Sequence, residues 1–147
     1  MAPILGIDYG SVRIGVAVSD ELRMLAHPVE TIPTGTNAVR RIAEIVRDKK
    51  AESVVVGVPR MMSGALGQAA EHVQIFIEKL RGALSCPIIP WDERLTTVAA
   101  QRALRDAGKS TRASRSYVDQ VAAQMILQGY LDSRAVTEPM DEMPELD

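Results

Sequence analysis

The chain opens with three short apolar runs, a pattern that predicts β-strands. Residues 4–7 and 13–19 are separated by a turn-like segment that contains Asp, Gly and Ser, so we expect them to form two antiparallel strands. Residues 26–32 are a third run of strand length. The start of the chain therefore predicts the antiparallel part of a sheet.

Helical and strand patterns alternate after this point. Residues 37–49 place apolar side chains at helical intervals, and Thr36 or Asn37 can cap the first turn. Residues 54–58 form a continuous apolar run rich in valine, which is typical of a strand buried on both faces. A loop at residues 59–64 leads to the next helical pattern.

The rest of the chain predicts three more helices and one strand. Residues 69–80 have an apolar helical face, and residues 87–91 are a candidate strand. Helical patterns follow at about 96–107 and 114–131, with Ser114 as a candidate cap. The order ββ(β)αβαβαα indicates an α/β domain whose mixed sheet is antiparallel on one side and parallel where helices intervene.

Length and composition indicate one globular domain. At 147 residues the chain has the size of a single domain, which we place at residues 1–134. Hydrophobic residues make up 46% and charged residues 24%, as in ordinary globular proteins. Aromatic residues make up only 3%, which argues against a row of side chains that stack on bases.

Cysteine and histidine content excludes several kinds of site. Cys86 is the only cysteine, so no internal disulfide can form, and with only His27 and His72 there is no zinc-binding spacing. We therefore expect a reducing, cytoplasmic environment. No apolar run is long enough to cross a bilayer, so we expect no membrane association.

Charge divides the chain into a basic body and an acidic end. The net charge is −2, but residues 135–147 hold five acids and no base, and two prolines. We expect this acidic tail to be mobile. The remaining body carries a small excess of bases, which permits a polyanionic partner.

Three carboxylates lie at positions that suit chemistry. Asp8 ends one apolar run, and Glu93 follows another, so both are expected at strand ends, where α/β proteins bind ligands. Asp119 lies inside a helical pattern, and the residues three and four positions further on are alanines. This spacing turns Asp119 toward the packed side of its helix, and small alanines would let that helix lie close to the sheet.

Each acid also has an ordinary structural interpretation. Asp8 can be a turn residue, and Asp92 and Glu93 can favour a helix N-terminus or pair with Arg94. Asp119 can form an ion pair with Arg115, four residues earlier. These alternatives stay open for each residue taken alone.

If the three acids converge, they predict a metal centre. Neighbouring carboxylates repel one another unless they are protonated or bridged by cations. Ligation by oxygen atoms alone suits magnesium or manganese better than zinc. Two such ions about 4 Å apart can clamp a phosphodiester, so hydrolysis of a nucleic-acid backbone is the natural chemistry.

A basic stretch lies between the second and third acids. Six bases and one acid separate Glu93 from Asp119, and residues 108–116 read as a flexible loop rich in hydroxyl and basic side chains. Such a loop can contact phosphates, although charged helix faces are also often simply solvated. Arg60, in the loop after the valine-rich run, can form part of a cleft wall. The expected nucleic-acid-binding residues are Arg13, Arg60, Arg94, Lys109, Arg112 and Arg115.

Four motifs, in order, resemble the YqgF family, also called RuvX-like, of the RNase H-like superfamily. The resemblance covers nearly the whole chain through Arg134. The matching segments are Asp8-Tyr9-Gly10 with Arg13-Ile14-Gly15-Val16-Ala17, Val56-Gly57-Val58-Pro59 with Gly64, Asp92-Glu93-Arg94-Leu95-Thr96-Thr97, and Val118-Asp119-Gln120-Val121-Ala122-Ala123.

The resemblance implies an RNase H-like fold, with a mixed five-stranded sheet and flanking helices. It also implies that Asp8, Glu93 and Asp119 are catalytic and bind divalent metal, and that the protein cuts structured RNA during 5′-end maturation of pre-16S rRNA in the cytoplasm. Cleavage of branched DNA at Holliday junctions is the alternative within the family, and a dimer would suit symmetric cutting, so we expect a monomer or a homodimer.

Two further function classes remain open. A domain with this basic surface can bind nucleic acid without cutting it, as an accessory factor. The Asp8-x-Gly10 pattern also opens the phosphate loop of sugar kinases and actin-like ATPases, but these enzymes close two such domains around the nucleotide, and 147 residues supply one.

Overall fold

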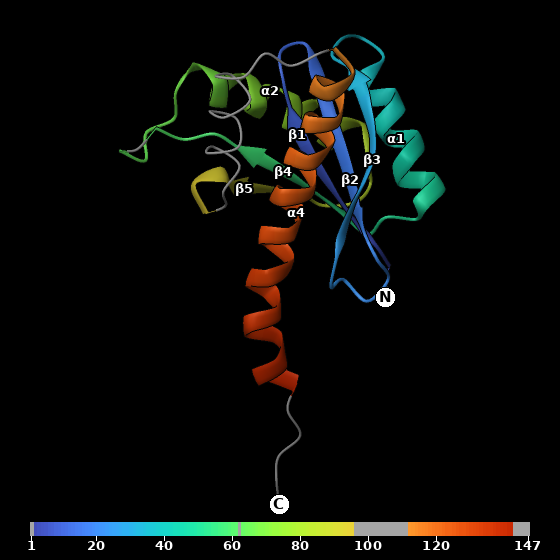
Figure 1. Cartoon of the computed structure of the whole chain (residues 1–147), viewed down its shortest axis with the longest axis vertical. Helices are drawn as coiled ribbons and strands as arrows, with labels where there is room; N and C mark the ends of the chain where they lie inside the picture. Colours follow the sequence, from blue (N-terminus) through green and yellow to red (C-terminus); the bar gives the residue numbers. More distant parts are fainter. Residues whose placement is uncertain (1, 62, 96–111, 143–147) are drawn as a thin grey trace, which may run out of the picture.

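The structure is a computed structural model that describes residues 2–61, 63–95 and 112–142, with the side chains of the last helix described from residue 118 to residue 135 (Figure 1). The strands are β1 Ile4–Tyr9, β2 Arg13–Ser19, β3 Ala26–Pro33, β4 Ser53–Val58 and β5 Ile88–Asp92. The helices are α1 Ala38–Lys49, α2 Gln68–Ala83, the short 3₁₀ helix η1 Glu93–Leu95 and α4 Arg112–Glu142.

The strands form one mixed sheet in the order β3-β2-β1-β4-β5. The β1–β2 and β2–β3 pairs are antiparallel, whereas β1–β4 and β4–β5 are parallel. This arrangement confirms the predicted mixed five-stranded sheet. Every residue of β4 is buried, as its uninterrupted apolar run predicted.

Helices cover both faces of the sheet. Helices α1 and α2 lie on one face, and α4 crosses the other (Figure 1). The alternation of side chains along each strand divides the core accordingly, because Leu5 and Ile7 pack under α1 and α2, whereas Ile4 packs with the residues of α4. The loops that follow β1, β4 and β5 therefore emerge at one end, between the two layers.

Two details of the first helices differ from the predictions. Asn37 precedes α1 as expected, but its side chain makes no capping hydrogen bond. The apolar face of α2 includes Ala70, which is buried, whereas Ala69 is exposed. Both differences concern the first turn of a helix, where sequence spacing alone does not fix the angle at which the helix meets the sheet.

The last helix is longer than predicted at both ends. It begins at Arg112, so residues 112–116 are helical and not part of a loop, and Ser114 lies inside the helix and not at its cap. It continues beyond Leu131 and ends at Glu142, within the acidic segment, whose mobility stays a prediction. The predicted helix at 96–107 lies outside the described residues. None of the described helices is long and apolar enough to cross a membrane.

Candidate active site

Asp8 lies near the carboxyl end of β1, and its side chain faces α4. It is four residues after Ile4, which packs with α4, so strand alternation places both side chains on the same face. Only 4% of Asp8 is exposed. A carboxylate is thus held under the last helix, at the end of the central strand.

Asp119 lies on α4, directly over Gly15 of β2. Gly15 is the residue that pairs with Asp8 across the two strands. A Cβ on Gly15 would collide with the backbone carbonyl oxygen of Asp119, so the absence of a side chain allows the helix to lie against the strand. Ala122 and Ala123 are buried against the sheet, as their small size predicted. Asp119 itself is 5% exposed, and it lies one strand away from Asp8.

Glu93 reaches the same face from the other side. It begins η1, immediately after β5, and is 4% exposed. A Cβ on Gly57 of β4 would lie 2.8 Å from Oε1 of Glu93, so the carboxylate extends over β4. Burial, followed by the negative charge of Asp92, raises the pKa of Glu93 to about 7.

Asp8 therefore has an acid on each side along one row of the sheet. Asp119 lies over Gly15, its neighbour on β2, and Glu93 extends over Gly57, which the parallel register of β1 and β4 places beside Asp8. The strand that carries Asp8 and the strand that leads to Glu93 are not neighbours, because β4 lies between them. With strands about 4.8 Å apart, Glu93 and Asp119 approach Asp8 from opposite sides.

The three acids do not form a closed metal-binding cluster. Within the described part of the chain, no group of three or more His, Cys, Asp or Glu side chains is arranged so that it could hold one metal ion. The donors are nevertheless all carboxylate oxygens on one face, with Asp8 between the other two. This distribution fits an ion such as magnesium, which takes one or two carboxylates and completes its shell with water and substrate phosphate. The residues fit such an ion, although not an all-protein cage.

Arg13 contacts the site through Asp119. Its Nε donates a hydrogen bond to Oδ2 of Asp119 at 2.6 Å, from β2 to α4. Arg13 was expected to bind nucleic acid, and Arg115 was the sequence candidate for an ion pair with Asp119. The structure assigns the ion-pair role to Arg13; the side chain of Arg115 lies outside the described residues. Arg13 and Asp119 are 106 positions apart in the sequence, so no local pattern predicts this pair.

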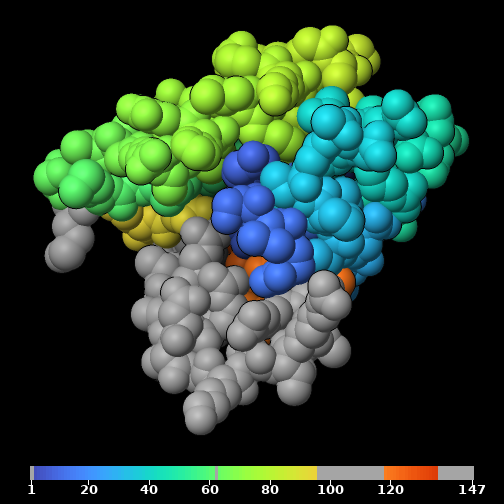
Figure 2. All heavy atoms as spheres, turned by 90° about the horizontal axis from the view of Figure 1, so that it is seen from above, coloured from blue at the N-terminus to red at the C-terminus, as the bar shows by residue number. Residues whose placement is uncertain are grey.

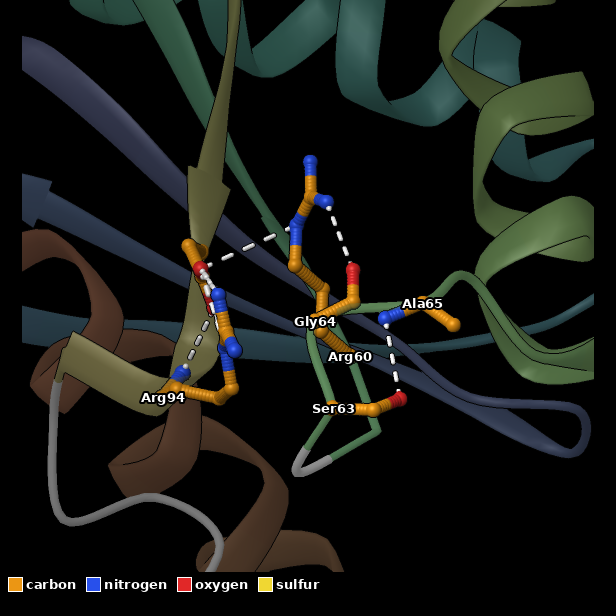
Figure 3. Close-up of polar contacts among 6 residues, drawn as sticks. Arg60, Ser63, Gly64, Ala65 and Arg94 are labelled. Carbon is orange, nitrogen blue, oxygen red and sulfur yellow. Dashed lines mark hydrogen bonds and ion pairs between the residues drawn. The ribbon is translucent and has the colours of Figure 1, made fainter.

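Two arginines converge on Asp92 at the edge of the site. Figure 3 shows Arg60, from the loop after β4, near Arg94, from η1, and both side chains form ion pairs with Asp92. Nη2 of Arg94 lies 2.7 Å from Oδ2 of Asp92, and Nε of Arg60 lies 3.7 Å from the same oxygen. The hydrogen bond from Arg94 holds the pKa of Asp92 below its usual range. Arg60 also donates to the carbonyl oxygen of Gly64, which has a φ of +88° that favours glycine.

The arginine pair agrees with one of the structural alternatives for this segment. Pairing with Arg94 was considered for Asp92 and Glu93, and the acid that pairs is Asp92. Sequence reasoning did not identify Asp92 as the residue that joins two loops, although its place between a strand and Glu93 was a usable signal. Arg60 and Arg94 remain candidates for phosphate contact, because both guanidiniums are partly exposed and contact Asp92, the residue before the buried Glu93.

The remaining predicted basic residues are only partly visible. Lys109 lies outside the described residues. Arg112 begins α4 and Arg115 follows within its first turn, but their side chains are not described. Their predicted role in binding nucleic acid stays a prediction.

Comparisons with known sequences agree with the arrangement of these motifs. A family model described as "RuvX: Holliday junction resolvase" matches residues 2–133. Proteins named "Putative pre-16S rRNA nuclease" from Rhodococcus opacus, Nocardia farcinica and Chloroflexus aggregans are 49%, 51% and 44% identical to this chain. Each alignment covers 89% of this chain, and 78%, 78% and 94% of the respective relative.

Comparison with solved structures supports the fold. The RuvC protein of Thermus thermophilus in complex with a Holliday junction substrate superposes with a TM-score of 0.59 at 16% identity, over 93% of this chain and 98% of that chain. A second structure of the Thermus thermophilus protein gives a TM-score of 0.55 at 14% identity, over 92% and 97% of the two chains. The predicted RNase H-like architecture is thereby confirmed at the level of the fold.

Proposed function

Since the chain belongs to the RuvX family, we propose that it is a metal-dependent nuclease that hydrolyses phosphodiester bonds in structured RNA, during 5′-end maturation of pre-16S rRNA in the cytoplasm. The observation that carries this proposal is the placement of Asp8, Glu93 and Asp119, all nearly fully buried, on one face at the end of the central strands. The relatives named "Putative pre-16S rRNA nuclease", which are 44–51% identical to this chain, favour an RNA substrate.

The acids would hold a divalent cation. When bound, such a cation supplies Lewis-acid activation of water and charge at the leaving oxygen. Asp8 lies between the other two carboxylates, so it is the residue best placed to share a cation with either of them. Arg13 holds one oxygen of Asp119 and so fixes the direction of that carboxylate.

The flanking cations would bind the substrate backbone. Arg60 comes from the loop after β4 and Arg94 from η1, and both contact Asp92, the residue before Glu93, where phosphates beside the scissile bond would pass. Asp92 keeps both guanidiniums at the edge of the site, because each lies within 4 Å of its Oδ2 atom. Binding should therefore depend on salt concentration, as expected for contacts to phosphates.

The central test is cleavage by an Asp8→Asn variant. We expect wild-type protein with magnesium to cut an rRNA precursor at its 5′ region, and the variant to lose at least about 100-fold in rate, because an amide cannot replace a carboxylate metal ligand. Asp48→Asn, an exposed acid in the last turn of α1, is the matched control and should cut normally. Cleavage that survives in folded Asp8→Asn protein would refute the proposed role of Asp8.

The same assay discriminates the alternative functions. A four-way DNA junction tested beside the RNA identifies a junction resolvase if only the DNA is cut. Binding that is sensitive to salt but gives no product with magnesium or manganese identifies a non-cleaving accessory factor. Loss of cleavage on addition of EDTA, restored by excess magnesium, is the result expected for a metal-dependent enzyme.

A further inference from the structure

Two adjoining cavities lie at the end of β1, on the face of the sheet opposite the acids. One has a volume of about 300 Å³ and lies between α2 and the start of α1, and the other has a volume of about 360 Å³ and lies beside the first turns of α2. Tyr9 and His72 line both cavities, so we treat the two as one groove. The other polar side chains of this Tyr9 groove are Ser11, Thr34, Thr36, Gln68 and Lys79.

The walls of the Tyr9 groove favour an anion. Among the described residues, no Asp or Glu lines either cavity, whereas Lys79, His72 and several hydroxyl groups do. A larger cavity between α2 and β5, about 720 Å³ in volume, differs in this respect, because its lining includes Glu71, Glu78 and Asp92 together with arginines. The Tyr9 groove is therefore the one of these cavities in which a phosphate meets basic and hydroxyl groups without a facing carboxylate.

An aromatic ring lies in the same groove as Lys79 and His72. Tyr9 is half-buried and packs on Phe76 of α2, with 4.5 Å between the ring centroids and 34° between the ring planes. His72 and Lys79 are seven residues apart on α2, so they share one side of the helix about 10 Å apart along its axis. This combination suits a nucleotide, because its base can stack on an aromatic ring while its phosphate contacts a basic side chain.

The groove is joined to the acids by one short segment. Tyr9 follows Asp8 in β1, and strand alternation directs the two side chains to opposite faces of the sheet. Thr34 fixes the loop that follows, because its hydroxyl donates to the carbonyl oxygen of Gly10 at 2.7 Å and its backbone N–H donates to that of Val12 at 3.0 Å. Figure 2, which views this end from above, shows the blue N-terminal segment between the green α2 region and the cyan region that includes the start of α1.

We propose that the Tyr9 groove binds one unpaired nucleotide of the substrate strand, with its base against Tyr9 and the phosphates on either side of it at Lys79 and His72. This inference rests on the proposed function, because it takes the bound polymer to be the nucleic acid cut at Asp8. The nucleic-acid strand would pass over the end of β1, from the acids on one face of the sheet to the Tyr9 groove on the other face. Structured RNA with an unpaired residue beside the cleavage site meets this requirement, and continuous duplex does not.

Binding without metal tests the groove independently of cleavage. In EDTA, a fluorescein-labelled single-stranded oligonucleotide and a fully paired hairpin are titrated with protein, and anisotropy is measured at several salt concentrations. Lys79→Ala should weaken single-strand binding about 3- to 10-fold and reduce the salt slope by about 0.7, the value for one phosphate contact. Lys49→Ala, which removes the same charge from the far end of α1, is the matched control and should bind normally.

Two further variants test the remaining contacts. His72→Gln should weaken single-strand binding, whereas His27→Gln, an exposed histidine on β3, should not. Tyr9→Leu should lose about 5-fold or more in affinity for the single strand, because stacking contributes about 1–3 kcal/mol per base. With an oligonucleotide that lacks one base, the difference in affinity between the wild type and Tyr9→Leu should become smaller. Thermal unfolding verifies that Tyr9→Leu is folded, and Lys79→Ala keeps the test decisive if it is not.

The outcomes separate the groove from the nuclease. If Lys79→Ala and Lys49→Ala bind equally, or if Lys79→Ala weakens the paired hairpin as much as the single strand, the groove proposal is overturned even when cleavage is normal. If the wild type cuts neither RNA nor DNA but Lys79→Ala and Tyr9→Leu weaken only single-strand binding, the groove stands and the proposed nuclease function fails.

Discussion

Nε of Arg13 on β2 lies 2.6 Å from Oδ2 of Asp119 on α4, and this ion pair joins the strand to the helix at the place where they cross. The side chain of Asp119 is 8% exposed and that of Arg13 is 31% exposed. A guanidinium that is partly in water therefore supplies a counter-charge to a carboxylate that is almost fully removed from it. Pairs of this kind are costly to break, because one charge is left in a poorly solvated place.

We predict that Arg13→Gln lowers the free energy of unfolding by about 1–2 kcal/mol, less than the 3–5 kcal/mol of a fully buried pair because Arg13 is partly solvated. Asp119→Asn, alone and combined with Arg13→Gln, completes a double-mutant cycle. Urea unfolding of the four proteins gives the coupling energy, which should exceed about 0.5 kcal/mol.

The exposed pair Arg47 and Asp48 is the control for this cycle. Their charged atoms lie 3.6 Å apart, but both side chains are largely in water. The same substitutions there should give a coupling energy near zero, within about 0.3 kcal/mol. A coupling energy as small as this between Arg13 and Asp119 would show that their ion pair does not stabilise the contact between β2 and α4.

Replacing Gly15 or Gly57 with alanine should lower the free energy of unfolding by different amounts, although both glycines lie directly under parts of the site. A Cβ on Gly15 meets the backbone of Asp119, which cannot move without displacing α4, so we expect Gly15→Ala to cost about 3 kcal/mol or more. A Cβ on Gly57 meets the ends of the Ile126 and Glu93 side chains, which can rotate, so about 1–3 kcal/mol is expected.

Chemical denaturation of the two variants provides the comparison. Gly82→Ala in α2 is the control, because a Cβ at this position meets nothing within 4 Å. Replacing a helical glycine with alanine should raise the free energy of unfolding by about 0.5–1 kcal/mol. Equal effects of Gly15→Ala and Gly57→Ala would contradict the closer seating of the helix on Gly15.

The parts of the fold that depend on local periodicity were predictable from the sequence. The valine-rich run of β4 and the apolar face of α2 specify an element and its buried side without distant information. The ends of α4 were not predictable in this way, because polar and acidic residues continue the helix beyond the part that packs on the sheet. The apolar periodicity of α4 ends where its side chains stop packing on the sheet, whereas the helix continues beyond that point.

The sequence singled out the three acids, whose catalytic role stays a prediction, but it did not show how they are arranged. Asp8, Glu93 and Asp119 each stood out locally, and the motifs placed them in one family. What no local pattern showed is that β4 lies between the strands of Asp8 and Glu93, or that Arg13 contacts Asp119. Both facts depend on strand order and on the crossing of α4, which are properties of the assembled sheet.

The two arginines on Asp92 should contribute separately to binding. Arg94→Ala and Arg60→Ala should each weaken binding of an RNA hairpin about 3- to 10-fold and reduce the salt slope by about 0.7–0.9, the expected effect of one lost phosphate contact. Arg47→Ala, which removes a more exposed arginine charge from α1, should leave both quantities unchanged. Anisotropy titrations between 50 and about 200 mM salt measure them. A slope that Arg94→Ala leaves unchanged would mean that Arg94 serves only to hold Asp92.

Glu93 gives the site a pH dependence whose sign follows from its raised pKa. In the folded protein its pKa is about 7, compared with 4.5 for the ordinary group, mainly because burial disfavours the charged form. Below the lower value both states are protonated and no penalty exists. As pH rises from 4.5 to 7, the unfolded chain loses its proton first, so the folded state loses stability, and above 7 the loss is complete.

We therefore predict that, with EDTA present, Glu93→Gln removes a loss of stability that wild-type protein shows between about pH 4.5 and 7, worth up to about 3 kcal/mol. Because glutamine carries no charge at either end, the variant should equal the wild type at pH 4.5 and exceed it at pH 7.5. Glu30, whose pKa is lowered by its hydrogen bond to Arg41, acts only at lower pH and in the opposite direction, so it does not mask the effect. Urea unfolding across this range measures the difference, and curves that stay parallel from pH 4.5 to 7.5 would contradict the buried, proton-binding state of Glu93.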